Sequence, residues 1–185
     1  MKIIGITYYD GSESVVLKSD SSMTVNRKPL FVPEAISDLQ ALPCVVLRVS
    51  RLGRCIAPRF ASRYYDAVAA GMDYFGADNL RRAVAAGKPW TEAVAFEGSL
   101  AIGSWQPTVN GQWSLSRGEQ VINRGEWKPT EEVLNSSIAR ASELLTIRQG
   151  DLIYVALNAQ PWRLQPNDLI RCTESEKELL YCKIK

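Results

Sequence analysis

The side chains that could do chemistry in this sequence are a few carboxylates and cations, most of them between residues 71 and 97. Carboxylates can act as general bases or bind a hard cation. A guanidinium, an ammonium and an amide can together bind a small carboxylic acid, and a tryptophan can form the rim of such a pocket. The candidate pocket residues are Asp73, Asp78, Arg81, Lys88, Trp90, Glu97 and Asn158.

The complete absence of histidine limits the chemistry further. Histidine is the usual general base at neutral pH and the commonest ligand of transition metals, so sites built on it are excluded. Catalysis would depend on carboxylates, lysine, tyrosine, cysteine or backbone groups. If the chain is an enzyme, its possible general bases are Asp73, Asp78, Glu97 or a tyrosine such as Tyr64, Tyr65 or Tyr74.

Composition indicates one ordinary globular domain, spanning residues 1–185. Hydrophobic residues make up 46% and charged residues 23%, with a net charge of +2 from 22 basic and 20 acidic residues. This balance predicts neither a nucleic-acid partner nor a membrane partner. A group of arginines is expected to be a solvated face, because its members are spread over a strand, a turn and a helix. These arginines are Arg48, Arg51, Arg54, Arg59 and Arg63.

The cysteines and the apolar runs predict a cytoplasmic protein. Cys44, Cys55, Cys172 and Cys182 form no C-x-x-C pair, and their spacing fits neither a zinc site nor a dense disulfide framework. No apolar run approaches the roughly 18 residues that a membrane helix requires. We therefore expect four buried or half-buried thiols.

Hydrophobic periodicity predicts a β-rich chain with two helices. Helical spacing of apolar residues predicts one helix over Arg59 to Ala70 and a second after the cap candidate Thr130, ending near Leu145. Turn residues are expected at Asp10-Gly11 and at 165–168. Strands are expected at residues 2–8, 14–18, 44–52, 152–157, 169–173 and 179–184. The pattern is typical of an α+β fold, with a mixed β-sheet or roll and a few helices packed on it.

Four segments together resemble the fumarylacetoacetate hydrolase family. Val16 to Ser22, followed by Lys28 to Pro33, resembles the L-K-P-x-S entry to the catalytic domain. Gly87 to Trp105 resembles a loop of the form W-T-x-A-K-x-F-D-x-x-x-P-L-G-P-W. Leu145 to Ile153 resembles the L-x-P-G-D-[LV]-I segment, and Leu164 to Ile170 resembles a later repeat of it. The resemblance covers nearly the whole chain and implies the mixed β-sandwich roll of the fumarylacetoacetase C-terminal domain.

The resemblance also implies a divalent cation, which a Glu-x-Glu pair on one strand and a further Asp would hold against a 2-oxo or 1,3-dioxo acid. In this sequence the pair falls at about Val45 and Leu47, and no Asp or Glu occurs between Asp38 and Asp66. The further Asp falls at Ala77, with Asp78 one residue away. Asp78 is more simply explained as an ion pair with Arg81 or a turn cap. The metal site of the family is therefore expected to be lost, with no cofactor.

The remaining catalytic elements of the family are also missing. Counting from Trp90 and Phe96, the family lysine falls at Val94, and no lysine occurs between Lys88 and Lys128. Glu97 keeps one acidic position, where a hydrogen bond that pins the loop is the favoured role. The T-G-T-P loop is replaced by the run from Tyr154 to Asn158, and the histidine of the water-activating dyad is absent.

These losses predict a degenerate, catalytically inactive member of the family. We expect it to keep the fold as a homodimer, and to bind a small carboxylic acid, through residues such as Arg81, Lys88 and Asn158, or a protein partner. The alternative is a divergent hydrolase or isomerase of 2-oxo or 1,3-dioxo acids with a rebuilt, metal-poor site. A third possibility is a subunit that completes or regulates an active homologue.

Overall fold

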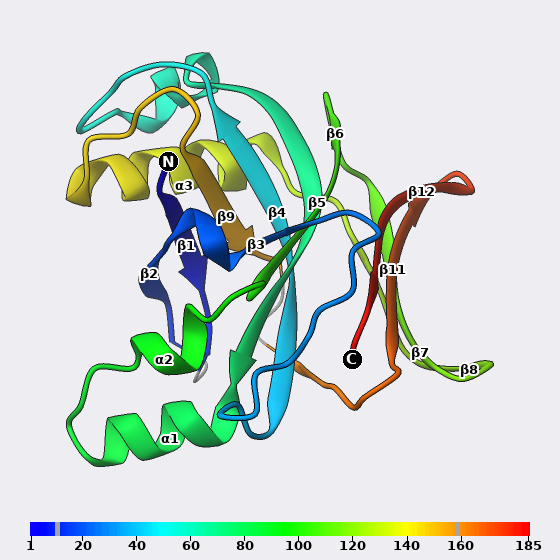
Figure 1. Cartoon of the computed structure of the whole chain (residues 1–185). Helices are drawn as coiled ribbons and strands as arrows, with labels where there is room; N and C mark the ends of the chain where they lie inside the picture. Colours follow the sequence, from blue (N-terminus) through cyan, green and yellow to red (C-terminus); the bar gives the residue numbers. More distant parts are fainter. Residues whose placement is uncertain (10–11, 158–159) are drawn as a thin grey trace.

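The protein folds around two packed β-sheets, in a computed structural model that describes residues 1–9, 12–157 and 160–185. Figure 1 shows the larger, curled sheet with helices on it and the smaller sheet standing against one end. The turn expected at Asp10-Gly11 lies outside the described residues.

The larger sheet has the strand order β2-β1-β9-β4-β5-β6-β3, with the short β10 paired to β4. It is mixed, because β1 pairs parallel to β9 and β3 parallel to β6 while the other neighbours are antiparallel. Its strands are β1 (Ile3–Thr7), β2 (Ser14–Lys18), β3 (Met23–Val25), β4 (Leu39–Val49), β5 (Tyr65–Gly76), β6 (Leu100–Gln106), β9 (Leu152–Ala156) and β10 (Trp162–Arg163).

The smaller sheet is antiparallel, with the order β12-β11-β7-β8. Its strands are β7 (Gly111–Arg117), β8 (Gln120–Trp127), β11 (Leu169–Glu174) and β12 (Lys177–Lys183). Beside the sheets lie the helices α1 (Ala77–Ala85), α2 (Thr91–Val94) and α3 (Glu131–Leu144), and the 3₁₀ turns η1 (Asp20–Ser22) and η2 (Pro58–Arg63).

The two faces of the larger sheet bury two separate hydrophobic clusters. One face packs against α3 and the smaller sheet, and it buries alternate residues of β4 such as Val45 and Leu47. The opposite face packs against α1 and α2, and it buries Leu42, Cys44 and Val46 of the same strand. Side chains of a strand alternate between faces, so a β4 residue and its neighbour belong to different clusters.

Most expected elements are present. The helix after Thr130 runs over Glu131–Leu144, and the Thr130 hydroxyl accepts a hydrogen bond from the Val133 amide, as expected of a capping residue. The fold class, a β-rich α+β fold with few helices, is confirmed. Within the described residues, no helix is long and apolar enough to cross a membrane.

The helix expected over Arg59 to Ala70 is wrong. That segment holds η2 and the first half of β5. β5 lies between β4 and β6 and is buried on both faces, so its apolar residues run continuously from Ala67 to Met72 instead of alternating with polar ones. Periodicity alone does not distinguish such a run from a buried helix. The strands β6, β7 and β8 and the helix α1 were not expected from the sequence.

Candidate functional site

A fully buried ion pair lies on the face of the larger sheet that α1 and α2 cover. The Lys18 ammonium at the end of β2 lies 2.7 Å from Asp73 Oδ1 in the C-terminal part of β5, and both side chains have no exposed surface. The ammonium also donates to the backbone oxygen of Ser99 at 2.8 Å and to its hydroxyl at 3.1 Å. All three of its hydrogens therefore have acceptors, as a buried cation requires.

Two tyrosines and a threonine complete this buried polar cluster, which we define as Thr7, Tyr9, Lys18, Asp73, Ser99 and Tyr154. Thr7 Oγ1 donates to Asp73 Oδ2 at 3.0 Å, and the Tyr9 hydroxyl donates to Asp73 Oδ1 at 3.3 Å. The Tyr9 and Tyr154 hydroxyls are 3.4 Å apart. The carboxylate of Asp73 thus receives three hydrogen bonds from three different strands or loops.

Burial dominates the acid–base properties of this cluster. It lowers the pKa of Lys18, although the charge of Asp73 acts in the opposite direction. It raises the pKa of Tyr9 and Tyr154 well above their usual value, and the nearby charge of Asp73 adds to this effect. The pKa of the neighbouring Cys44 thiol is raised for the same two reasons. The tyrosines and the thiol are therefore neutral at physiological pH.

Tyr154 shapes the floor of the cluster by occupying the space over a glycine. β1 and β9 pair in parallel with Gly5 beside Tyr154. A Cβ atom added to Gly5 would lie 2.1 Å from the nearest atom of the tyrosine ring. Only glycine at this position leaves room for the ring beneath the ion pair.

Apolar side chains fill the space around the buried polar cluster. Leu42, which pairs with Asp73 across β4 and β5, has no exposed surface, and Val94 of α2 is only 3% exposed. Phe75 and Ala77 belong to the same hydrophobic cluster. The positions expected for the family lysine and the further Asp, Val94 and Ala77, therefore lie together and are packed by hydrocarbon.

The structure does not bring the positions expected for the Glu-x-Glu pair to the face of the sheet that carries Val94. Val45 and Leu47 are buried in the cluster on the α3 side of the sheet, away from Val94. The residues of β4 that share the cluster with Val94 are Leu42, Cys44 and Val46. Neither face of β4 offers a carboxylate, because the strand contains none.

The residues in this region do not fit a divalent cation. Mg²⁺ and similar ions require several oxygen ligands, and at least part of the set must be carboxylate. Asp73 is the one carboxylate in the buried polar cluster, and Lys18 neutralises it. Within the described residues, no group of three histidine, cysteine, aspartate or glutamate side chains could hold a metal.

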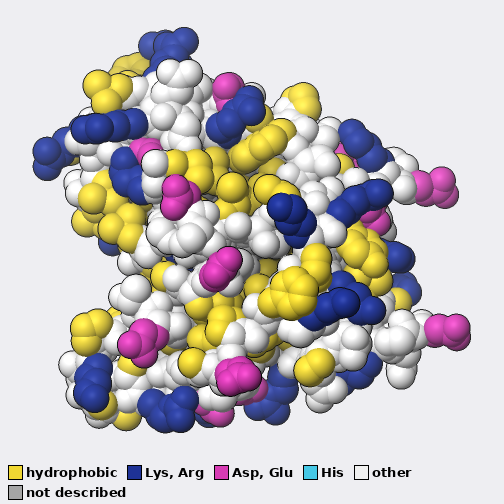
Figure 2. All heavy atoms as spheres, viewed as in Figure 1, with side chains coloured by type: hydrophobic (Ala, Val, Ile, Leu, Met, Phe, Trp, Pro, Cys, Tyr) yellow, Lys and Arg dark blue, Asp and Glu magenta, His cyan; other side chains and the backbone are white. Residues whose placement is uncertain are grey.

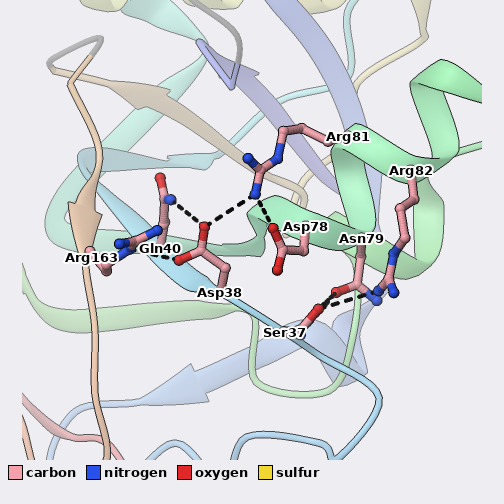
Figure 3. Close-up of polar contacts among 8 residues, drawn as sticks. All are labelled: Ser37, Asp38, Gln40, Asp78, Asn79, Arg81, Arg82 and Arg163. Carbon is pink, nitrogen blue, oxygen red and sulfur yellow. Dashed lines mark hydrogen bonds and ion pairs between the residues drawn. The ribbon is translucent and has the colours of Figure 1, made fainter.

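A second set of ion pairs lies on the surface where β4 begins and α1 follows β5 (Figure 3). Asp38 accepts a hydrogen bond from Arg163 Nε at 2.8 Å and one from Gln40 Nε2 at 3.0 Å, and the Arg81 guanidinium lies 3.6 Å away. Arg81 also pairs with Asp78 one helical turn earlier, as expected from the sequence. The hydrogen bond from Arg163 is the main reason that the pKa of Asp38 is below its usual value.

Neighbouring contacts fix the loop before β4 to helix α1. Asn79 Oδ1 accepts from the Ser37 amide at 2.9 Å, and Asn79 Nδ2 donates to the Ala35 backbone oxygen at 2.8 Å. The Ala77 amide donates to the backbone oxygen of Asp38, whose φ of 52° is in the left-handed region. This surface region is thus a structural joint between two segments.

Lys88 and Trp90 line an open hollow of about 640 Å³ between α1 and α2. Arg82, Asn79 and Glu92 also line it, so it offers two cations and one carboxylate beside an indole ring. The ring of Trp90 also packs edge-on to Tyr9, with centroids 6.1 Å apart, so Trp90 contacts the buried polar cluster as well as lining the hollow.

The structure thus distributes the predicted pocket residues over several places. Asp78 and Arg81 are together in the surface network, and Lys88 and Trp90 are together in the hollow. Asp73 is buried, and its tyrosine neighbours are Tyr9 and Tyr154, whereas Tyr74 faces the other side of the sheet. Asn158 lies outside the described residues.

The expected hydrogen bond of Glu97 is not formed. Its side chain is exposed, and within the described part of the chain it makes no hydrogen bond or ion pair. The partners that sequence reasoning missed are Lys18, Tyr9 and Tyr154. Lys18 shares the inward face of β2 with Val16 while Leu17 is exposed, but Val15, Val16 and Leu17 are all apolar, so the sequence does not indicate which face is buried.

Comparison with solved structures places this geometry in a known fold. No protein-family model matches the sequence, and no curated protein matches it. A protein from Yersinia pestis assigned to the fumarylacetoacetate hydrolase family superposes with a TM-score of 0.81 at 16% identity, over 100% of this chain and 92% of that one. This chain has its fold.

Two solved enzymes show the same likeness. Fumarylpyruvate hydrolase from Pseudomonas aeruginosa, in complex with Mn²⁺ and pyruvate, gives a TM-score of 0.78 at 16% identity, over 99% of this chain and 88% of that one. The 5-carboxymethyl-2-hydroxymuconate delta-isomerase from Mycobacterium smegmatis gives a TM-score of 0.80 at 15% identity, over 99% of this chain and 76% of that one. The expected resemblance is therefore confirmed as a likeness of fold, which carries no activity with it.

Proposed function

We propose that this chain is a catalytically inactive protein with the fold of the fumarylacetoacetate hydrolase family, retained as a binding scaffold. The observation that supports the proposal is the filled interior. Leu42, Phe75 and Val94 occupy the space around Asp73, and Lys18 binds the one buried carboxylate there. A divalent cation and an oxo acid would have to displace packed hydrocarbon and break an ion pair with no exposed surface.

The test compares this chain with the Pseudomonas aeruginosa fumarylpyruvate hydrolase under the same conditions. We expect Mn²⁺ and Mg²⁺ at micromolar concentration to leave the melting temperature of this chain unchanged, since only ligands that bind the folded state raise it. We expect no turnover of acylpyruvates or of oxaloacetate above the background rate. A melting-temperature increase with Mn²⁺ together with turnover would overturn the proposal.

The alternative function is a divergent, metal-independent enzyme of oxo acids, and one observation favours it. The buried polar cluster holds a lysine of lowered pKa beside a carboxylate and two tyrosine hydroxyls, a combination that catalytic sites also use. Asp73→Asn separates the two proposals, with Glu119→Gln, which changes an exposed acid between β7 and β8, as its matched control. Activity present in the native chain and in Glu119→Gln but lost in Asp73→Asn, under conditions in which urea denaturation shows that the variant is folded, would establish the alternative.

The binding function that we propose for the hollow between α1 and α2 is recognition of a small carboxylic acid. Lys88 and Arg82 provide positive charge there and Trp90 provides an apolar wall. Titration with pyruvate, followed by NMR shifts of the tryptophan indole protons, is expected to move the signal of Trp90. Lys88→Ala should remove this shift, and Lys128→Ala, which changes an exposed lysine elsewhere, should keep it. Equal shifts in both variants would contradict this site.

A cytoplasmic location and a homodimer complete the proposal. Both follow from the composition and from the family resemblance. Light scattering on the purified chain measures its mass, for which the dimer predicts twice 20.6 kDa. A mass of one chain over the micromolar range would refute the dimer without affecting the rest of the proposal.

A further inference from the structure

The segment between β4 and β5 forms a basic surface that the proposed function does not use. We define the arginine loop as residues 50–64, which include η2 and carry Arg51, Arg54, Arg59 and Arg63, all exposed. No aspartate or glutamate occurs from Leu39 to Tyr65. The basic residues of this loop therefore have no acidic neighbour within their own segment.

Two of these arginines are held against the same exposed aromatic ring. The guanidinium carbon of Arg59 lies 4.9 Å from the centroid of the Phe60 ring, and that of Arg63 lies 5.3 Å from it. Stacking on an aromatic ring is favourable for a guanidinium, but it does not neutralise its charge. Two like charges are thus brought together around Phe60 without a carboxylate between them.

None of the four arginines of the loop forms an ion pair with a described residue. Glu132 of α3 lines a hollow together with Pro58 of the loop and likewise forms no ion pair with the described part of the chain, whereas two other nearby acids have partners of their own. Asp66 pairs with Arg48 at 2.7 Å, and Glu143, near the end of α3, pairs with Arg140 at 3.3 Å. Arg48 also stacks on Trp105 at 5.4 Å, and its ion pair with Asp66 distinguishes it from the arginines of the loop. The positive charge of the arginine loop remains available to an external anion.

Backbone contacts fix the loop to the rest of the molecule. Gly53 and Ile147 exchange two backbone hydrogen bonds of 3.0 and 2.9 Å, and the Cys55 amide donates to the Ser142 backbone oxygen at 2.9 Å. The side chains of Ile56 and Ala61 are buried beneath it. The basic groups are thus displayed on an ordered support, which lowers the entropy cost of binding.

Exposed apolar side chains accompany the arginines. Leu52 is 68% exposed between Arg51 and Arg54, and Phe60 is 41% exposed between the second pair. The loop lies beyond the ends of the strands at the top of Figure 1, and Figure 2 shows basic and apolar side chains gathered along that same edge. Basic side chains interspersed with exposed leucine and phenylalanine are typical of surfaces that rest on anionic lipid.

We propose that the arginine loop docks on a membrane surface that contains anionic phospholipid. The guanidinium groups would bind lipid phosphates, and Leu52 would enter the boundary between headgroups and acyl chains. A single-stranded nucleic acid fits less well, because base stacking requires a free aromatic face and the Phe60 ring already carries two guanidinium groups. The sequence alone predicts a solvated face and no membrane partner, and the proposal departs from that expectation because the fold brings these side chains together.

The test is sedimentation of the full chain with vesicles of phosphatidylcholine alone and with vesicles that contain phosphatidylglycerol as well. We expect binding to the anionic vesicles only, and less binding as the salt concentration rises. The double variant Arg59→Ala/Arg63→Ala should weaken the apparent affinity about tenfold or more. Leu52→Ser should also weaken it, by about threefold or more.

Matched controls use exposed residues elsewhere on the chain. Arg124→Ala/Lys128→Ala removes two charges from the end of β8 and the residue after it, and Val84→Ser changes an apolar side chain of α1 that is 63% exposed. We expect both to bind like the native chain. Equal losses in the controls, equal binding to neutral vesicles, or no binding to either vesicle would overturn the proposal.

An oligouridylate of about 20 nucleotides distinguishes the other class of polyanion, since arginine-rich surfaces also bind phosphate backbones. Binding of the oligonucleotide through Arg59 and Arg63 without binding of anionic vesicles would overturn the proposal in favour of a nucleic acid. The outcome is independent of the catalytic test above, because the arginine loop shares no hydrogen bond with Lys18 or Asp73.

Discussion

One ion pair of this protein lies in the interior, and a group of ion pairs lies at the surface. The side chains of Lys18 and Asp73 have no exposed surface, so water cannot solvate either charge if the pair is broken. Asp38 is paired with Arg163 and Arg81, whose side chains are 71% and 68% exposed. The same chemical contact should therefore have different energetic consequences, because exposed cations are solvated with or without their carboxylate.

The largest effect is expected from Lys18→Met. It leaves Asp73 buried without a counter-charge, and removal of one partner of a buried pair costs about 3–5 kcal/mol. The free energy of unfolding, measured by urea denaturation, should fall by that amount. The double variant Lys18→Met/Asp73→Asn should be more stable than Lys18→Met alone, because the unpaired charge is gone. A double variant less stable than the single one would show that the polar network matters more than the charge.

The next effect is expected from Val94→Lys, which places a lysine where the family has one. The side chain of Val94 is 3% exposed, so a charged ammonium would be desolvated among hydrocarbon neighbours. We expect a loss of about 2 kcal/mol or more in urea denaturation, and no turnover of acylpyruvates. Val84→Lys, at an exposed position of α1, is the control and should be neutral. Activity in Val94→Lys would mean that the interior is open to substrate.

The smallest effect on stability is expected from Asp38→Asn, and its size should depend on pH. The folded state lowers the pKa of Asp38, so its charge stabilises the protein above the usual pKa of aspartate, about 3.8. This contribution is lost as the pH falls through the lower, folded-state pKa. With exposed partners it should be about 1 kcal/mol or less at neutral pH.

The measurement for Asp38 is the stability of the native chain and of Asp38→Asn between pH 7 and pH 3. The difference between them should shrink as the pH falls. Asp66→Asn, which breaks an ion pair with both side chains near half exposed, is the control and should change stability less. A constant difference at every pH would show that charge is not the cause.

The fold was predictable from the sequence to the extent that it depends on alternation and caps. β2 and α3 were expected within a residue or two, because β2 contains a β-branched run and α3 has a capping threonine. β5 was not, because a strand buried on both faces carries no alternation. β7 and β8 have polar outer residues and turn signals too weak to recognise without their partner strands.

The site was less predictable, because it depends on which residues meet across strands far apart in sequence. The absent carboxylates of β4 and the missing lysine at Val94 can be read directly from the sequence. The pairing of Lys18 with Asp73 joins residues 55 positions apart, and nothing local indicates it. The sequence does not show which β4 residue lies beside Asp73. The register of β4 against β5 in the structure shows that this residue is Leu42.

The contact between Gly5 and Tyr154 has a consequence for how related sequences can vary. A side chain at position 5 and a tyrosine at position 154 exclude each other, since the added Cβ would lie 2.1 Å from the ring. Relatives with this strand pairing should therefore show a correlated pattern, in which any residue other than glycine at position 5 accompanies a smaller residue at position 154. In an alignment of such relatives, the residues at these two positions would show whether an aromatic ring fills the floor of the buried polar cluster.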